Sequence, residues 1–275
     1  MQGSRTLART PRDEGTPTRV EITLEVVSDY LHVGQGKATI PTGIESTNLD
    51  FNKVLAMFNR GDPLAYSQID NLFADYNAFP RDSGKVIIPG STVKGAVRTR
   101  LEMSIPNSCY IVDRTGNGKS PGYVKIFNPD QNKRSDNYAK GHSVNPGKVC
   151  PVCDLLGSPG LGSRVSFSDL VLTSGRLGVA EIDKMEYEVA MKGSRFSGFF
   201  LVNLKKNEIG AILYGLGIRC EAGKPFSRTI LLGRFKFENP QFGRVKFTAN
   251  LKDQEQCNQI NDFVKEYRPK DIREV

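Results

Sequence analysis

The stretch covering residues 85–102 constrains the fold more than any other, because it contains a strand, a tight turn and a helix start in that order. Residues 85–88 form a short apolar run typical of a buried strand, and Pro89 and Gly90 end it. Ser91 then suits the N-cap of a helix. Three apolar residues recur at every fourth position and form one stripe along that helix: Val93, Val97 and Leu101.

The charges at the start of this helix are unusual. A cation in the first turn of a helix is unfavourable by about 0.3 to 1 kcal/mol, yet Lys94 lies there and Arg98 follows one turn later on the same side. Exposed backbone N–H groups, the missing side chain of Gly90 and two cations together describe a binding site for an anion such as phosphate. The alternative is an ordinary glycine turn followed by a solvated lysine and arginine.

Composition limits the classes of protein to be considered. The chain has 275 residues, of which 38% are hydrophobic, so it can bury a substantial core. Its formal net charge of +8 favours an anionic partner. No run of about 18 apolar residues indicates a membrane helix, and the N-terminus lacks the apolar segment of a signal peptide. We therefore expect a cytoplasmic protein that does not interact with membranes.

Composition and periodicity along the sequence favour a disordered N-terminal arm followed by one folded domain. Residues 1–18 are rich in Arg, Thr, Pro and Gly, which predicts a disordered basic arm, and residues 19–275 predict a single domain. Residues 20–26 alternate apolar and polar side chains, as in a half-buried strand. Further helices are predicted over residues 51–58, 209–216 and 252–267. This alternation of strand and helix patterns favours an α+β fold.

The cysteine spacing indicates a metal site. Cys150 and Cys153 form a C-x2-C pair, the spacing that lets two thiolates reach one Zn²⁺. Cys109 and His142 complete a set of four that would clasp residues 104–149, a polar insertion with few apolar side chains of its own. Metal binding would supply the folding free energy that such a segment lacks. Four protein ligands leave no open coordination position, so this zinc would be structural.

Buried thiols are the alternative to the metal site. In a reducing compartment, five cysteines do not indicate a disulfide framework. Cys220 and Cys257 have no partner of metal-ligand spacing, and we expect both to be buried free thiols.

A nucleotide-binding P-loop is excluded at residues 116–120, which read GNGKS. Asp113 stands where the first glycine of the loop is required, and Pro121 follows where a phosphate-capping helix would run. Nucleotide hydrolysis is therefore not expected.

Basic and aromatic residues alternate around glycines in residues 184–200. The members of this group are Lys192, Gly193, Arg195, Phe196, Gly198, Phe199 and Phe200. Such a mixture suits a flexible hairpin that grips a single nucleic-acid strand by charge and stacking. A strand with one aromatic face in the core explains Phe196 and Phe200 equally well.

Several stretches resemble motifs of the RAMP superfamily, the RNA-binding proteins of CRISPR systems, and especially of the backbone-type (Csm and Cmr) subunits of type III effector complexes. Residues 88–98 read IPGSTVKGAVR and are similar to the family's IPGSSxKGxxR signature. Residues 31–36 resemble its LHIGxG turn, and residues 43–46 resemble a GIDS turn. Further matches are the CPVC turn at 150–157, a glycine-rich loop leading to FSD at 158–169, and a C-terminal glycine-rich loop at 232–234 and 242–247.

This resemblance implies an RRM-like (ferredoxin-like) sheet with helices on one face and irregular insertions, one of them stapled by zinc. Family members are usually shorter at residues 51–84, which marks a second insertion beside 104–149. The implied function is that of a backbone subunit that binds CRISPR RNA and positions guide and target RNA. Its implied partners are CRISPR RNA, target RNA and other type III effector subunits in a filament-like hetero-oligomer.

The resemblance also places the RNA-binding residues. Glycines in the turns would let the RNA approach the backbone, cations would seat its phosphates, and the hairpin around Arg195 would act as a thumb between bases. The residues concerned are His32, Gly34, Gly36, Gly90, Ser91, Lys94, Arg98, Lys192, Arg195, Gly233, Arg234, Gly243 and Arg244.

Cleavage of target RNA is the alternative function. The resemblance implies an acidic residue after the first strand that acts with a divalent cation, Mg²⁺ or Mn²⁺. Glu45 is the closest match, although the family pattern has Asp there, and Asp50 is the next candidate. The non-catalytic alternatives are equally simple: Glu45 would be a solvated loop residue, and Asp50 would be the N-cap of the following helix. A guide-processing endoribonuclease is disfavoured, because the only histidines, His32 and His142, lie far apart in the sequence.

Overall fold

The computed structural model describes residues 17–34, 37–41, 51–62, 73–106, 108, 122, 125–126, 149–203 and 208–275. Within these residues, antiparallel sheets and a few helices form a mixed fold, which confirms the α+β class expected from the sequence. The predicted basic arm lies outside the described residues up to residue 16, as does most of the polar insertion at 104–149.

The elements have the following bounds. The strands are β1 (Pro17–Val26), β2 (Tyr30–Leu31), β3 (Lys37–Pro41), β4 (Phe73–Asn77), β5 (Arg81–Asp82), β6 (Lys85–Ile88), β7 (Val165–Phe167), β8 (Leu170–Ser174), β9 (Leu177–Ile182), β10 (Met185–Met191), β11 (Arg195–Asn203), β12 (Ile218–Glu221), β13 (Lys224–Ser227), β14 (Ile230–Leu231) and β15 (Arg244–Ala249). The helices are α1 (Phe51–Asn59), α3 (Gly90–Ser104), α6 (Pro151–Leu156), α7 (Glu208–Gly215) and α8 (Asp253–Tyr267).

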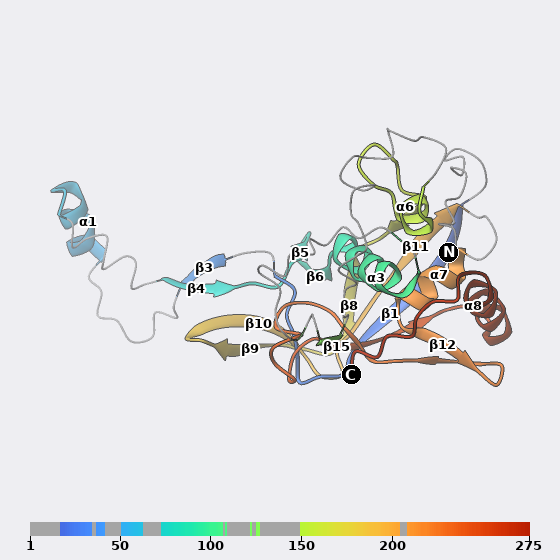
Figure 1. Cartoon of the computed structure of the whole chain (residues 1–275). Helices are drawn as coiled ribbons and strands as arrows, with labels where there is room; N and C mark the ends of the chain where they lie inside the picture. Colours follow the sequence, from blue (N-terminus) through green and yellow to red (C-terminus); the bar gives the residue numbers. More distant parts are fainter. Residues whose placement is uncertain are drawn as a thin grey trace.

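The largest sheet has the strand order β14-β15-β1-β11-β8-β6-β5, with β7 paired to β11 (Figure 1). All its neighbouring strands run antiparallel. Strand β1 is central, and its alternation has the predicted effect: every second residue from Val20 to Val26 is buried, while the residues between them are exposed or half-buried. One face of this sheet therefore carries the core.

Helices α3, α7 and α8 cover that face. The predicted apolar stripe of α3 is fully buried in the same core as the inward face of β1. Two glycines allow the helices to pack closely: a Cβ on Gly210 would lie 2.0 Å from the Gln259 carbonyl oxygen of α8, and one on Gly215 would lie 2.7 Å from Val97 of α3. These glycines weaken the helix propensity of α7, but they are what its packing requires.

A second sheet extends away from the first. Its strand order is β2-β10-β4-β3, with β9 paired to β10, and α1 lies beyond β3 and β4 at the far end of this projection (Figure 1). Within the insertion expected at residues 51–84, residues 73–77 form β4. This segment is a strand because it pairs with β3 and β10, and local propensity does not reveal such a pairing.

Residues 184–200 form ordinary strands of the two sheets. Phe196 and Phe200 are fully buried, so the core alternative holds for these two aromatic residues. Lys192 lies in the exposed turn between β10 and β11, and Arg195 pairs with Glu25 on the solvated face of the large sheet, at 3.2 Å.

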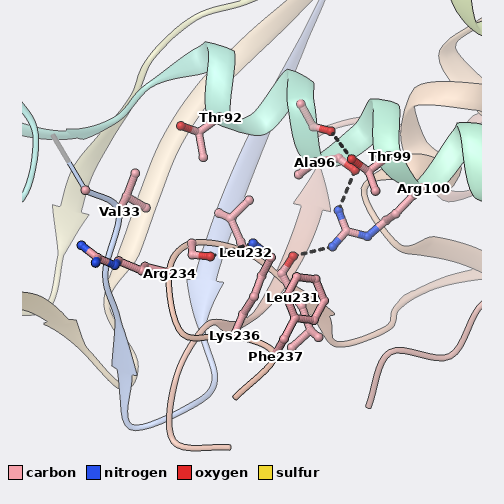
Figure 2. A pocket seen from close by; sticks show the side chains of 13 residues that line it. Val33, Thr92, Ala96, Thr99, Arg100, Leu231, Leu232, Arg234, Lys236 and Phe237 are labelled. Atoms are coloured by element: carbon pink, nitrogen blue, oxygen red, sulfur yellow. Dashed lines mark hydrogen bonds between the residues drawn. The ribbon is translucent and has the colours of Figure 1, made fainter. Parts of the chain in front are cut away.

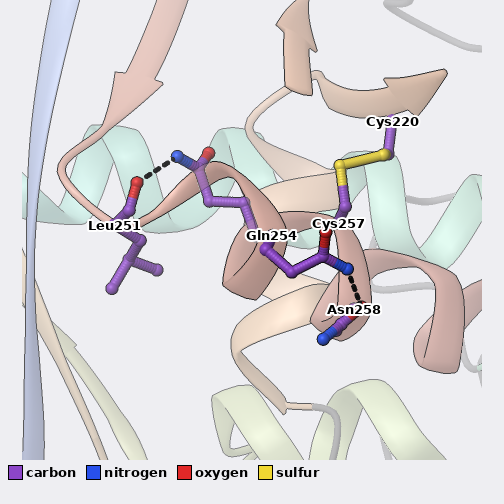
Figure 3. Close-up of a disulfide and its surroundings, with 6 residues drawn as sticks. Cys220, Leu251, Gln254, Cys257 and Asn258 are labelled. Atoms are coloured by element: carbon purple, nitrogen blue, oxygen red, sulfur yellow. Dashed lines mark hydrogen bonds between the residues drawn. A yellow bond between two sulfur atoms is a disulfide. The ribbon is translucent and has the colours of Figure 1, made fainter. Parts of the chain in front are cut away.

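The expectation that Cys220 and Cys257 are free thiols is wrong, because they form a disulfide. The β12–β13 hairpin packs over α8 and brings the two Cα atoms to 5.3 Å, within the range that a disulfide needs (Figure 3). The cysteines are 37 residues apart in the sequence, and only the packing of the hairpin on the helix shows that they meet.

A buried ion pair ties the C-terminus to α3. The Glu274 carboxylate accepts hydrogen bonds from the Arg100 guanidinium and from the Leu231 backbone N–H, at 2.7 Å for the latter. Both charged side chains are almost completely buried, so removing one would leave the other uncompensated. None of the helices in the described residues is long and apolar enough to span a membrane.

Reducing the disulfide should destabilise the protein. Closing a loop of this length in the unfolded chain contributes roughly 2 to 4 kcal/mol to stability. We expect dithiothreitol to lower the thermal midpoint of the wild-type protein and to leave a Cys220→Ala/Cys257→Ala variant unchanged, as measured by differential scanning calorimetry. An equal response of both proteins to the reductant would contradict the disulfide.

Candidate nucleic-acid interface

Helix α3 begins against a carboxylate of the chain itself. The Gly90 backbone N–H donates a hydrogen bond to Asp169 Oδ1 at 2.8 Å. A Cβ on Gly90 would lie 2.3 Å from the Phe167 carbonyl oxygen, so the turn tolerates only glycine at this approach. Asp169 and Phe167 belong to the FSD stretch, which therefore holds the start of α3 in place.

The predicted N-cap at Ser91 is wrong. The helix starts one residue earlier, and its N-cap is Pro89, which makes no side-chain capping bond. Asp169, in the connection between β7 and β8, supplies the acceptor that a local cap would have supplied. Ser91 is instead an exposed residue of the first turn.

Lys94 and Arg98 lie on the flank of α3 that faces α6 and β7. Lys94 Nζ donates to the Val165 carbonyl oxygen at 3.3 Å, and burial, followed by the charge of Arg98, lowers the pKa of Lys94. The Arg98 guanidinium donates to the Gly157 carbonyl oxygen and pairs with Glu102 at 3.3 Å. Both cations thus hold neighbouring segments, while their predicted role as phosphate ligands stays a prediction.

The opposite flank of α3 lines a cleft of about 500 Å³ (Figure 2). The helix contributes a row of small residues at helical spacing: Thr92, Gly95, Ala96 and Thr99. The other wall comes from the turn after β2 and from the loop after β14. Two of the predicted glycine motifs, at Gly34 and Gly233, meet in this cleft.

The two glycine motifs are joined through the backbone. The Arg234 N–H donates to the His32 carbonyl oxygen at 2.9 Å. Gly233 has φ +84°, and a Cβ there would lie 2.4 Å from the same oxygen. Gly233 is therefore required both by its left-handed backbone and by its close approach to the turn.

The rest of this loop closes on itself. Gly243 has φ +73° and donates to the Tyr30 carbonyl oxygen at 2.9 Å, while the Arg244 guanidinium donates to backbone carbonyls of residues 239, 240 and 242. Residues 235–240, between the two stretches that resemble a glycine-rich loop, form a turn anchored by Phe235 packed edge-on against Tyr187. Gly243 and Arg244 support the loop from outside the cleft lining.

The cleft is positively charged. Its lining contains Arg234, Lys236 and Arg100 and no acidic residue, and Arg100 is already neutralised by Glu274. Lys236 donates to the Gly233 carbonyl oxygen at 2.7 Å, and burial, with the nearby Arg100, lowers its pKa. Arg234 is exposed, with its guanidinium 5.3 Å from the Tyr187 ring. An anion in the cleft would meet cations and backbone amides rather than carboxylates.

His32 lies beneath this cleft. Its ring is fully buried between aromatic residues, and Nδ1 lies 2.7 Å from the Glu188 carbonyl oxygen. Because a carbonyl can only accept, Nδ1 carries the proton, and Nε2 is buried without a hydrogen-bond partner among the described residues. Burial therefore lowers the pKa of His32.

The structure does not bring every predicted site residue together. Lys192 and Arg195 lie at the β10–β11 junction and do not line the cleft. Gly36, Glu45, Asp50, Cys109 and His142 lie outside the described residues. Cys150 and Cys153 are both buried at the start of α6, where Cys150 Sγ accepts a hydrogen bond from the Cys153 N–H at 3.3 Å.

Sequence reasoning marked only Gly34, Gly233 and Arg234 among the residues that line the cleft. Thr92, Gly95 and Thr99 share one flank of α3, and their spacing of three and four residues was a usable signal. Lys236 lies between the two stretches that resemble the C-terminal glycine-rich loop, so no motif marked it. Its position depends on the fold of the loop.

The comparison with known families agrees with this arrangement of motifs. A model of the RAMP superfamily matches residues 23–269, which include the central sheet and both walls of the cleft. The chain belongs to the RAMP superfamily. Among curated proteins, no match to this RAMP protein was found.

Gly233→Ala should disrupt the cleft. Gly160 provides a matched control, because its φ is also positive, at +76°, while a Cβ there would meet nothing within 4 Å. We expect Gly160→Ala to cost about 1 kcal/mol of stability from backbone strain alone, and Gly233→Ala to cost about 3 kcal/mol or more, in urea denaturation. Equal costs would show that the approach to His32 is not tight.

His32 should make stability fall at acid pH. Because its folded-state pKa is below its unfolded value, its contribution to stability is full above about pH 6.5 and is lost as the pH falls below that value. We expect the thermal midpoint to drop more between about pH 7.5 and pH 5 in the wild type than in His32→Asn, whose amide can still donate to Glu188. Identical pH profiles would contradict a buried neutral His32.

Proposed function

We propose that this RAMP protein binds CRISPR RNA as a backbone-type (Csm/Cmr) subunit of a type III RNA-guided interference complex, where it positions guide and target RNA. RAMP proteins are associated with type III CRISPR complexes and act in multisubunit assemblies that bind RNA. The observation that carries the proposal is the cleft in which Gly34, Gly95 and Gly233 lie beside Arg234 and Lys236.

The chemistry of the cleft suits an RNA backbone. Glycines on three separate segments leave room for a phosphate to approach main-chain groups, and cations lie at one wall. The hydroxyl of Thr92 is available on the helix side, whereas Thr99 Oγ1 donates to the Gly95 carbonyl oxygen. Such contacts carry no base information, so binding would be independent of guide sequence.

We further propose that the central sheet is RRM-like (ferredoxin-like). The order β15-β1-β11-β8, antiparallel throughout, with α3 and α7 as the crossing helices, supports this assignment. The strands β5, β6 and β14 would then be additions at the sheet edges. The second sheet would combine strands inserted after β1, namely β2, β3 and β4, with the β9–β10 hairpin inserted between β8 and β11.

Assembly and location are part of the same proposal. The projection that carries α1 leaves Leu55 and Phe58 exposed, and a filament-like hetero-oligomer would offer such side chains a neighbouring subunit to contact. We also propose that the protein is cytoplasmic, as expected from its sequence.

RNA affinity should depend on Arg234. Arg234→Ala removes this exposed cation and should weaken binding of a fluorescein-labelled single-stranded RNA. It should also reduce the slope of log K against log salt concentration by about 0.7, the effect of one lost phosphate contact. Lys246→Ala is the control, because Lys246 is also exposed but lies on β15, on the solvated face of the sheet. Equal losses in both variants, measured by fluorescence anisotropy, would rule out the cleft as the binding site.

A structural zinc ion remains part of the proposal. Cys150 and Cys153 fit it, since their sulfurs belong to one turn and Cys150 Sγ already accepts an N–H as a metal-bound thiolate would. Cys109 and His142 would be the remaining ligands. We expect the purified protein to hold about one zinc ion per chain and Cys150→Ser/Cys153→Ser to lose it, measured by mass spectrometry of the metal. A metal-free wild-type protein would contradict the site.

Target-RNA cleavage is a separate question. The described residues contain no cluster of three His, Cys, Asp or Glu side chains able to hold a metal ion, and Glu45 and Asp50 lie outside them. Cleavage with Mg²⁺ or Mn²⁺ therefore stays a prediction from sequence. Loss of cutting by the assembled complex in Glu45→Ala or Asp50→Ala, with RNA retained, would establish it.

A further inference from the structure

A second group of cations lies away from the RNA cleft, between the β12–β13 hairpin and the segment after α8. We call it the arginine pocket, and it is formed by Arg219, Arg228 and Arg273 with the aromatic side chains of Tyr214 and Phe226. Two adjoining hollows of about 430 and 490 Å³ share its three arginines. Both volumes lie in the range of small-ligand sites, about 300 to 1,000 Å³.

Arg219 is held rigidly and has an unused donor. Its guanidinium stacks over the Tyr214 ring at 3.4 Å, and one terminal nitrogen donates to the Tyr214 and Ile218 carbonyl oxygens at 2.7 and 3.0 Å. Its Nε is buried and has no hydrogen-bond partner within the described chain; the closest carboxylate oxygen, on Asp271, is 3.7 Å away. A buried N–H of a charged group without an acceptor is costly, and the positive charge of Arg219, which lines both hollows, is only weakly offset by Asp271 at 3.7 Å.

The other two arginines differ in their pairing. Arg228 donates to both carboxylate oxygens of Asp271, at 2.5 and 2.6 Å. Arg273 is exposed and makes no hydrogen bond or ion pair with any described residue. Asp271 pairs with Arg228, lies 3.7 Å from Arg219 and also interacts with the charge of Arg273, so three arginines share this one carboxylate. The other acidic side chains of the lining are Glu221 at the exposed rim and Glu274, which is paired with Arg100, so the pocket keeps a net positive charge.

This balance favours a phosphate monoester, which carries a charge of about −1.5 to −2 at neutral pH. Arginine forks match phosphate oxygens in geometry as well as charge. Phe226, 39% exposed at the rim with the Arg228 guanidinium 6.0 Å from its ring, offers a flat surface for a base. We propose that the arginine pocket binds the phosphate monoester of a nucleotide, either free or at the end of an RNA strand.

The pocket is a site separate from the cleft. Of the residues that line the cleft, only Arg100 also lines the pocket, and that side chain is engaged by Glu274. The disulfide of Cys220 with Cys257 fixes the strand that carries Arg219, next to Cys220. Binding at the pocket therefore does not rest on RNA binding in the cleft.

Calorimetric titration of the full chain with AMP and with adenosine tests the proposal. AMP should bind at least about tenfold more tightly than adenosine, because the phosphate supplies the decisive contacts. Arg273→Ala should remove most of this difference, whereas Arg176→Ala, which removes another exposed arginine outside the pocket, should not. Equal binding of AMP and adenosine, or no binding of either, would overturn the proposal.

Asp271→Asn gives a prediction of opposite sign. The substitution removes the negative charge that pairs with Arg228, so the Arg228 guanidinium becomes available to the phosphate. AMP should then bind about three- to tenfold more tightly, even if the variant is less stable. A purely structural role for the ion pair predicts no gain, and weaker binding would count against the pocket.

Short RNAs with and without a terminal phosphate distinguish the two sources. A preference for the phosphorylated RNA that disappears in Arg273→Ala assigns the pocket to an RNA end, and AMP binding without that preference assigns it to free nucleotides. RNA lacking the terminal phosphate reports on the cleft alone, so failure of the cleft and failure of the pocket give different results.

Discussion

The hydrogen bond from the Gly90 backbone N–H to the Asp169 carboxylate is the contact on which the rest of the structure depends. It joins the start of α3 to the junction of β7 and β8, and the bare Cα of Gly90 lets the turn lie directly on the Phe167 carbonyl. Such a cap is worth about 0.5 to 2 kcal/mol, but its larger effect is to set the direction of α3 across the sheet.

Because α3 crosses the sheet in this direction, its two flanks have different roles. Lys94 holds β7 through the Val165 carbonyl and Arg98 holds the end of α6 through the Gly157 carbonyl, while the small residues on the other flank leave a cleft open. The loop that closes this cleft is attached to the turn after β2 through main-chain bonds at His32 and Tyr30. The charged wall at Arg234 is therefore held by backbone geometry, and its guanidinium stays exposed to a ligand.

Much of the fold follows from periodicity in the sequence. The alternation at residues 20–26 predicted β1, and the stripe through Val93 and Val97 predicted the buried face of α3, because both patterns reflect which face meets the core. The family motifs marked Gly34 and Gly233, and the fold brings these two glycines together in one cleft. The cap of α3 was missed because Asp169 lies 79 residues from Gly90, and the disulfide because Cys220 and Cys257 meet only through tertiary packing. The same limit applies to the arginine pocket, whose members come from three segments.

The most direct measurement of the central claim is a steric one. Gly95 lines the cleft, and a Cβ added there would meet nothing within 4 Å, so Gly95→Gln should fill the cleft without a clash and should slightly stabilise α3. Gly162→Gln is the matched control, because Gly162 has equally open space and no positive φ but lies outside the cleft. Single-stranded RNA affinity should fall at least about tenfold in Gly95→Gln and remain at the wild-type value in Gly162→Gln. Wild-type affinity in a stable Gly95→Gln variant would contradict RNA binding in this cleft.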